Sequence, residues 1–228
     1  MTGKKQNTGL LFRAGRPAAA ELFCRWLYPA HCAMCDGLLG RTEKGICTSC
    51  RQHVSRGRYP FPGGTAAFPY KGVYRDAVRR FKYGGRPEYA AFFADAIICA
   101  APELLSVRCP DVLVPVPIHR DRFRERGYNQ AEELARELSL QTQIPYDPGL
   151  VVRLRNTKPQ SGLDPDGRRK NIQGAFSVRR GAEVPKRVLI VDDIRTTGST
   201  IAEMEKVLTA HGAGEVRAVC ICLAADDR

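Results

Sequence analysis

The most informative stretch of this chain is a pair of acids followed by a hydroxyl-rich turn: Asp192, Asp193, Thr196, Thr197, Gly198, Ser199 and Thr200. Ionised aspartates only accept hydrogen bonds, which suits the vicinal hydroxyls of a ribose. The turn leads directly into a helical pattern, and the start of a helix offers free N–H groups and a partial positive charge that favour a phosphate. The order of these groups predicts a site for a ribose 5-phosphate. The alternative, ordinary capping of a helix, needs only one such residue.

The elements on either side of this turn are predicted by the apolar pattern. Residues 188–191 are four β-favouring apolar residues in a row, as in a strand buried on both faces of a parallel sheet. After the turn, apolar side chains recur at helical spacing at Ile201, Met204, Val207 and Leu208. This order puts the turn at the carboxyl edge of an α/β sheet, where such folds bind their ligands.

The same string resembles the phosphoribosyl pyrophosphate (PRPP) signature of type I phosphoribosyltransferases. The resemblance implies that Asp192 and Asp193 hold the ribose 2- and 3-hydroxyls and are the candidate catalytic residues. It also implies that residues 196–200 wrap the 5-phosphate, and that Mg²⁺ accompanies PRPP. Arg195 adds a positive charge beside the expected phosphate pocket.

A second phosphate site is expected after the apolar run at 112–116, where a proline-set turn leads into a basic run at 120–126. In type I phosphoribosyltransferases the loop that faces the diphosphate also follows a core strand, and a magnesium ion bridges the oxygens. The resemblance therefore assigns this role to Ile118, His119 and Arg120. The alternative is a basic helix start that faces water, with Asp121 and Glu125 as partners.

Two Cys-x-x-Cys pairs, Cys32 with Cys35 and Cys47 with Cys50, are separated by a short glycine-containing loop. Each pair can supply one side of a tetrahedron, so the pattern predicts a structural zinc knuckle with four thiolate ligands. Two disulfides or a redox pair are the competing interpretations. His31 and His53 flank the cluster and are spare ligand candidates.

The segment 68–86 alternates aromatic and basic side chains, and such a pattern can bind single-stranded nucleic acid through stacking and phosphate contacts. The candidate nucleic-acid residues are the cations Lys71, Arg79, Arg80, Lys82 and Arg86, with Tyr70, Tyr74 and Tyr83 among them. In the alternative interpretation the aromatic rings fill the core and the cations are merely solvated.

The rest of the pattern alternates strands and helices, which predicts a mostly parallel sheet flanked by helices. We expect helices near 74–81, 88–101 and 128–140, strands at 112–116, 151–152 and 216–223, and a long, basic lid-like loop over 153–176. The expected units are a mobile tail at 1–20, the zinc knuckle at 21–58 and a phosphoribosyltransferase-like domain at 59–228. A short amphipathic stretch at 22–28 precedes the knuckle, and a Pro/Gly-rich hinge at 59–64 follows it.

The composition indicates a polyanion-binding protein of the cytoplasm. The 228 residues carry a formal net charge of +12, which favours nucleic acid, phosphorylated small molecules or an anionic membrane face. No segment approaches the roughly twenty apolar residues of a membrane span. Nine cysteines without an export signal favour a reducing compartment.

Taken in order along residues 20–224, these motifs resemble the ComF family of competence and DNA-utilisation proteins. They are the four-cysteine knuckle, the aromatic–basic segment, Val-Pro-Val-Pro117 followed by Arg126-Gly-Tyr-Asn-Gln130, the segment from Arg153 to Phe176 and the PRPP signature. The resemblance implies DNA uptake and contact with single-stranded DNA or its helicase. The alternative is an active Mg²⁺-dependent enzyme that transfers ribose 5-phosphate from PRPP to a nitrogen acceptor. Nothing in the sequence identifies that acceptor.

Overall fold

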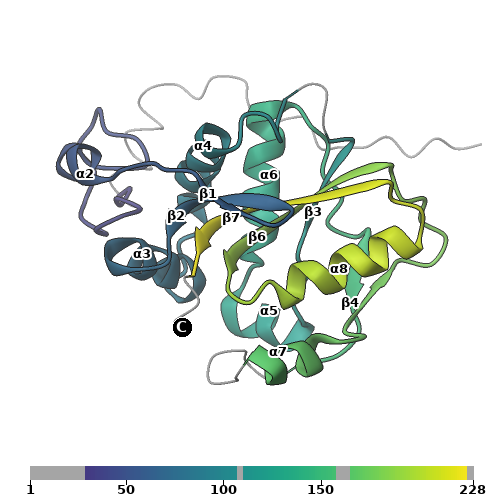
Figure 1. Ribbon diagram of the computed structural model, residues 1–228. Coiled ribbons are helices and arrows are strands. Elements are labelled where there is room, and N and C mark those ends of the chain that lie inside the picture. The colour runs from purple at the N-terminus through teal and green to yellow at the C-terminus, as the bar shows by residue number, and fades with distance from the viewer. Residues whose placement is uncertain (1–28, 107–109, 158–164, 225–228) are drawn as a thin grey trace, which may run out of the picture.

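A five-stranded sheet forms the centre of the molecule, and its strands lie side by side in the order β1-β2-β7-β6-β3 (Figure 1). The computed structural model describes residues 29–106, 110–157 and 165–224. The strands are β1 (Tyr59–Phe61), β2 (Gly64–Pro69), β3 (Val112–Pro115), β6 (Arg187–Arg195) and β7 (Glu215–Leu223). The expected tail at 1–20 and the amphipathic stretch at 22–28 lie outside the described residues.

All pairs in this sheet are parallel except β1 with β2, which confirms the predicted α/β fold. The central strand β6 is buried on both faces, as its continuous apolar run predicts. Val188 and Ile190 belong to one hydrophobic core, whereas Leu189 and Val191 belong to the other. The polar end of the same strand carries the acidic pair.

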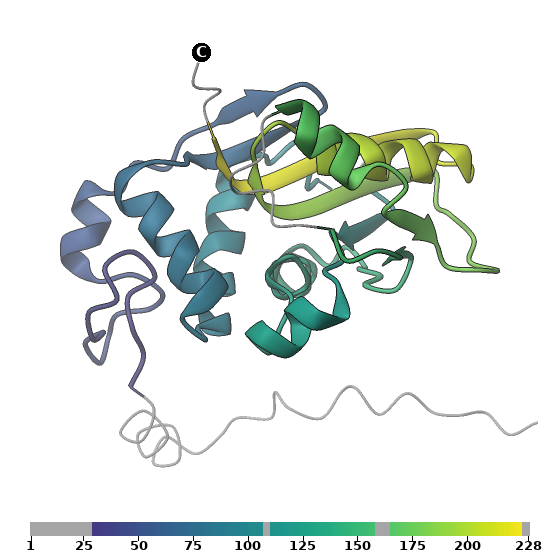
Figure 2. The same ribbon diagram turned by 90° about the horizontal axis from the view of Figure 1, so that it is seen from below.

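The two faces of the sheet are covered by different elements (Figure 2). Helices α4 (Ala90–Ala100) and α6 (Gln130–Thr142) pack on one face. Helices α7 (Pro165–Ile172) and α8 (Ser199–Ala210) lie on the other, with the small antiparallel ribbon of β4 (Val151–Arg153) and β5 (Phe176–Val178). Among the described residues, no helix is long and apolar enough to cross a membrane.

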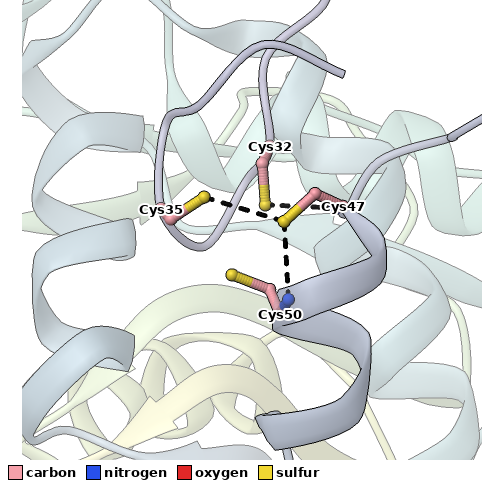
Figure 3. A group of neighbouring side chains, drawn as sticks. All are labelled: Cys32, Cys35, Cys47 and Cys50. Carbon is pink, nitrogen blue, oxygen red and sulfur yellow. Dashed lines mark hydrogen bonds between the residues drawn. The ribbon is translucent and has the colours of Figure 1, made fainter. Parts of the chain in front are cut away.

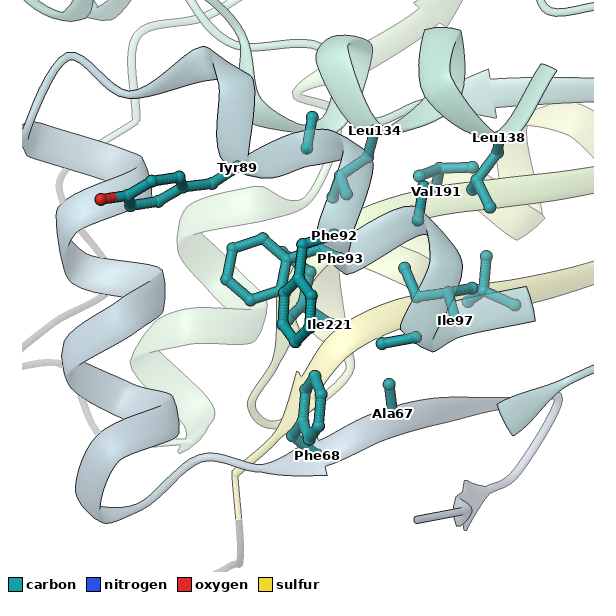
Figure 4. Packing of buried hydrophobic residues seen from close by; sticks show 14 of the residues in the cluster. Ala67, Phe68, Tyr89, Phe92, Phe93, Ile97, Leu134, Leu138, Val191 and Ile221 are labelled. Carbon is teal, nitrogen blue, oxygen red and sulfur yellow. The ribbon is translucent and has the colours of Figure 1, made fainter. Parts of the chain in front are cut away.

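The core under α4 is rich in aromatic rings, which pack against β7 (Figure 4). Phe68 lies 6.3 Å from Phe92 between ring centroids, and Phe92 in turn meets the edge of Phe93. The same core includes four residues of the cysteine-rich segment: Cys32, Ala33, Met34 and Ile46. The knuckle is therefore packed onto the sheet's helices through a shared apolar cluster. It also contributes helix α2 (Thr48–His53).

The expected hinge at 59–64 is wrong, because these residues form the β1–β2 hairpin. Pro60 is tolerated on β1 because this is the edge strand, and Gly63 takes the positive φ of 79° at the tip. A Cβ on Gly64 would lie 2.1 Å from the Ala218 carbonyl oxygen of β7. The glycine therefore lets β2 enter the main sheet.

The segment between β4 and β5 also differs from the expected loop, because part of it is helix α7. The proline at its first position, Pro165, is well tolerated there since its missing N–H would have no helical partner. Residues 158–164 of the expected lid lie outside the described residues. Three further elements complete the described fold: α3 (Gly72–Tyr83), η1 (Pro87–Tyr89) and α5 (Arg120–Arg126).

Candidate functional site

The site lies where two neighbouring parallel strands send their chains to opposite faces of the sheet. After β3 the chain leads to α6 on one face, and after β6 it leads to α8 on the other. Open α/β sheets bind their ligands in the crevice at the carboxyl edge where the chain divides in this way. The Val116 N–H donates to the Val191 carbonyl oxygen at 2.9 Å. The loop at 117–119 therefore starts directly beside Asp192.

A small pocket opens over the hydroxyl-rich turn, as the sequence predicts for a phosphate. Its lining combines the turn with the first residues of α8: Asp192, Ile194, Arg195, Thr196, Gly198, Ser199, Thr200 and Ile201. Gly198 holds a left-handed φ of 78° immediately before the helix, and the Thr197 hydroxyl lies 2.7 Å from that of Ser199. The start of α8 and the hydroxyls around it give this pocket the chemistry of an anion site.

Arg195 adds the positive charge that the sequence places beside this pocket. Its guanidinium lies over the ring of Phe61, 4.7 Å from the centroid, and also covers Gly198. A Cβ on Gly198 would lie 2.8 Å from Nη2 of Arg195. The glycine therefore serves both the backbone turn and the close approach of a cation.

The two aspartates have different surroundings. Asp192 lines the pocket, and its Oδ1 accepts a hydrogen bond of 2.8 Å from the Asp193 N–H. Asp193 is buried and does not line the pocket. Its Oδ2 lies 3.0 Å from the ammonium of Lys82, which reaches it from α3. The predicted pair is thus present at the end of β6, but only Asp192 faces the turn.

Burial governs the electrostatics of these three groups. Burial, together with the neighbouring charge of Asp193, raises the pKa of Asp192 to about 7. Burial alone would lower the pKa of Lys82, but the charge of Asp193 outweighs it and the pKa is raised. Lys82 is therefore a stable ammonium, whereas Asp192 changes protonation near neutral pH.

The predicted diphosphate loop follows β3 as expected. His119 caps α5, where its Nδ1 accepts from the Asp121 N–H at 3.3 Å and lies 3.1 Å from a carboxylate oxygen of the same residue. Ile118 is half-buried and Arg120 is exposed. None of the three lines the pocket over the turn, although the loop that carries them starts beside Asp192.

Beside this loop lies a cluster of arginines that sequence reasoning did not connect. Arg122 donates to the Thr157 carbonyl oxygen at 3.0 Å, and Arg153 donates to the Thr157 hydroxyl and, at 3.5 Å, to the Pro117 carbonyl oxygen. Arg126 lies one turn further along α5. Its spacing of four residues from Arg122 is the signal that could have indicated a shared face.

The five candidate nucleic-acid residues do not form one exposed basic surface, because some of them have partners within the protein. Lys82 is paired with Asp193, as described above. Arg80 donates to the Met34 carbonyl oxygen, and Arg86 lies near the carboxylates of Asp36 and Glu88. The remaining two, Lys71 and Arg79, are exposed.

The aromatic residues of the segment 68–86 also differ in their exposure to solvent. Tyr74 stacks on Phe68 at 4.7 Å between ring centroids, as the interpretation in which the rings fill the core expects. Tyr83, at the end of α3, is 66% exposed. Only Tyr83 therefore combines a large ring with an open surface.

The four cysteines converge on one point (Figure 3). The Sγ atoms of Cys32, Cys35, Cys47 and Cys50 all lie within 4.8 Å of one another, and that of Cys35 is 3.8 Å from that of Cys47. Four sulfurs around a zinc ion at about 2.3 Å would be roughly 3.8 Å apart, so the cluster fits a tetrahedral metal. His31 and His53 are outside this group.

One thiol of the knuckle ionises more easily than an ordinary cysteine, and several contacts hold the knuckle against the rest of the domain. Burial opposes ionisation of Cys32, but backbone N–H groups, first that of Cys47, lower its pKa to about 7. The turn that ends in Asp36 is contacted by Arg80, by Arg86 with 3.6 Å between Nε and Oδ1, and by the Tyr89 hydroxyl. These contacts join the knuckle to α3 and to η1.

Comparison with known proteins agrees with this architecture. Residues 124–228 match the phosphoribosyl transferase domain family. Competence protein F of Haemophilus influenzae is 30% identical over 82% of this chain and 93% of that protein. DNA utilization protein YhgH of Escherichia coli K12 is 29% identical over 84% of this chain and 89% of that protein. Competence protein ComFC of Streptococcus pneumoniae is 28% identical over 67% of this chain and 64% of that protein.

Among solved structures, the purine phosphoribosyltransferase of Pyrococcus horikoshii Ot3 aligns with a TM-score of 0.37 and 21% identity, covering 58% of this chain and 74% of that chain. The assignment rests on the sequence relatives, since a score of this size carries no argument of its own. The match to Competence protein F spans nearly all of that protein. The chain belongs to the ComF family of competence and DNA-utilisation proteins.

Proposed function

We propose that this protein binds PRPP or a related ribose 5-phosphate at the carboxyl edge of β6 and acts in DNA uptake or utilisation. The observation that carries the proposal is the pocket over the turn at 196–200, which joins a helix start, hydroxyls and Arg195 to one face of Asp192. A phosphate and a neighbouring sugar hydroxyl need this combination of donors and acceptor.

In the proposed complex the 5-phosphate accepts hydrogen bonds from the turn, while Asp192 accepts one from a ribose hydroxyl. Asp193 reaches the second hydroxyl only by sharing its carboxylate with Lys82, whose ammonium lies 3.0 Å away. Carboxylate oxygens also suit Mg²⁺, a hard cation that binds to phosphates and to one or two acids. The Asp192 carboxylate is the acceptor available for it on the pocket side.

The proposed role in DNA handling is supported by the names of the relatives and by the charge of the chain. The formal net charge of +12 favours a polyanionic partner, and Lys71 before α3 and Arg79 on α3 are exposed. Single-stranded DNA is the proposed macromolecular ligand. A structural zinc held by the four cysteines completes the proposal.

The second candidate function is transfer of the ribose 5-phosphate to a nitrogen acceptor. It is favoured by the arginines beside the 117–119 loop, because positive charge there would stabilise a departing diphosphate. Catalysis would then consist mainly of positioning and electrostatics.

Calorimetric titration with PRPP and Mg²⁺ tests the binding site. We expect Asp192→Asn to weaken binding by about tenfold, because a neutral amide is a poorer hydrogen-bond acceptor for the hydroxyl. Glu205→Gln, which removes an exposed carboxylate from the far part of α8, is the matched control and should bind within about twofold of wild type. Equal affinities for wild type and Asp192→Asn would contradict the proposed ribose contact. Release of diphosphate with a panel of nitrogen bases then separates an enzyme from a binding protein.

A further inference from the structure

An exposed aromatic ring stands beside the candidate ribose site. Tyr83 follows Lys82 at the end of α3, and Lys82 contacts Asp193. The Arg126 guanidinium lies over the Tyr83 ring, 4.8 Å from its centroid, and donates from Nη2 to the tyrosine hydroxyl at 3.2 Å. The ring is therefore held in place while 66% of the residue remains exposed. A fixed, exposed ring is a surface on which a planar base can stack.

The arginines next to this ring have neutral partners throughout the part of the chain that the structure describes. Arg126 donates to the Gln130 side-chain oxygen at 3.1 Å, while Arg122 and Arg153 donate to carbonyl and hydroxyl oxygens. The Nε atoms of Arg126 and Arg153 are buried without a hydrogen-bond partner. The charge of Asp192 acts on Arg153 from beyond ion-pair distance. A half-buried group of cations with no carboxylate at ion-pair distance among the described residues is an attractive position for an anion of several charges.

The charges of this group act on one another. Burial, and then the charge of Arg126, lowers the pKa of Arg122. Burial, and then the charge of Arg122, lowers the pKa of Arg153 to about 10. This repulsion would be relieved by phosphates bound between the guanidiniums. Two more exposed apolar side chains, Phe123 and Leu154, are sequence neighbours of these arginines.

We propose that single-stranded nucleic acid binds across Tyr83, Arg122, Arg126 and Arg153, here called the arginine platform, and that its bound end competes with PRPP for the acidic pair. One base stacks on Tyr83, and backbone phosphates lie on the arginines. The inference rests on the proposed function, since it makes the strand and PRPP alternative ligands of one crevice. A diphosphate alone would use the arginines but would leave the exposed Tyr83 ring without a role.

Fluorescence anisotropy with an end-labelled oligothymidylate at low salt tests the platform. We expect Arg126→Gln to weaken oligonucleotide binding about fivefold or more, because it removes a phosphate contact and releases the Tyr83 ring. Arg180→Gln, the same loss of charge at an exposed position after β5, should change affinity by less than about twofold. Tyr83→Leu should weaken binding, whereas Tyr83→Phe should keep it, because Phe retains the ring without the hydroxyl. Unfolding temperatures equal to that of wild type show that each variant is folded.

Competition completes the test. Saturating PRPP with Mg²⁺ should raise the apparent Kd of the oligonucleotide severalfold. The proposal is overturned if Arg126→Gln and Arg180→Gln behave alike, if Tyr83→Leu binds as wild type does, or if bound PRPP leaves oligonucleotide affinity unchanged. Calorimetry of PRPP alone is carried out on the same samples. Absence of PRPP binding there would contradict the proposed function. PRPP binding without competition would overturn the inference that the strand and PRPP share a site, and would leave the proposed function unaffected.

Discussion

The two neighbouring aspartates of β6 contribute differently because their surroundings differ. Asp192 faces the pocket without a cationic side chain at ion-pair distance among the described residues, whereas Asp193 is held by Lys82 at 3.0 Å. Burial, with the charge of Asp193, raises the pKa of Asp192 to about 7 from an ordinary value of 3.8. The folded protein therefore binds this proton more tightly than the unfolded chain does. Asp192 lowers stability progressively as the pH rises from about 4 to 7, and its effect is complete above pH 7.

Replacement of Asp192 by Asn should therefore stabilise the protein while it weakens the ribose site. The gain in the free energy of unfolding should grow between about pH 4 and pH 7 and reach on the order of 4 kcal/mol at pH 8. The Asn side-chain oxygen can still accept from the Asp193 N–H, so the local backbone is kept. Urea titrations across this pH range measure the effect, and a gain that does not change with pH would contradict it.

Asp193→Asn should have the opposite effect, because it leaves the Lys82 ammonium in a poorly solvated position without its partner. The side chains of Lys82 and Asp193 are only 19% and 12% exposed, so we expect a loss of about 3 kcal/mol. The double variant Lys82→Met with Asp193→Asn should recover most of this loss in the same urea titrations. A single variant as stable as wild type would show that the ion pair has no net effect.

Gly198 can be tested as the residue that shapes the phosphate turn. An alanine there must adopt the left-handed φ of 78° and place its Cβ 2.8 Å from the Arg195 guanidinium. We expect Gly198→Ala to cost about 1–2 kcal/mol of stability and to displace Arg195 from the pocket. Gly63→Ala, also at positive φ but with nothing within 4 Å of the added Cβ, is the matched control. It should lose similar stability and keep PRPP affinity, whereas Gly198→Ala should lose both.

The elements that are predictable from sequence are those whose signal is local. The run at 188–191, the acids and the turn lie together in one stretch, so β6, α8 and the site between them could be predicted. The β1–β2 hairpin was missed because Pro60 and Gly64 indicate a break unless β7 is known to lie alongside. The pairing of Lys82 with Asp193 depends on distant segments that meet only in the fold. Because the neighbours of Lys82 in the sequence are basic, the sequence favours an exposed, DNA-binding role for this lysine.

Helix α3 contacts both the knuckle and the acidic pair. These contacts predict which residues become less protected when the metal is lost. Arg80 contacts the Met34 carbonyl oxygen, and Lys82 contacts Asp193, from the same helix. Chelation of the metal should raise hydrogen exchange at residues 30–55 and at the end of α3, while β6, β7 and α8 stay protected. Equal exchange with and without chelator would contradict this.

The metal itself can be counted in matched variants. Cys47→Ser should lose the metal, because it removes one of four converging thiolates. Cys99→Ser changes an exposed cysteine outside the cluster and should retain about one zinc per chain. Metal analysis of anaerobically purified protein that finds far less than one zinc in wild type would contradict the zinc assignment.

The molecule as a whole carries a large positive excess, and this should appear in the salt dependence of strand binding. Each phosphate contact releases counterions, so the logarithm of the binding constant should fall by about 0.7 per contact for each tenfold rise in salt. Arg126→Gln should reduce this slope by about that amount, and Arg180→Gln should leave it nearly unchanged. Binding that is independent of salt would contradict an electrostatic strand site despite the net charge of +12.

The pairing of β2 with β7 brings together two strands that lie far apart in the sequence, residues 64–69 and 215–223. During synthesis the hairpin leaves the ribosome long before its neighbour exists, so it must wait with one edge unpaired. Chains arrested before Glu215 should therefore be cut by protease within 59–69, whereas full-length protein should resist. Assembly of the sheet, and with it of the proposed ligand site, is postponed until residues 215–223 have been synthesised.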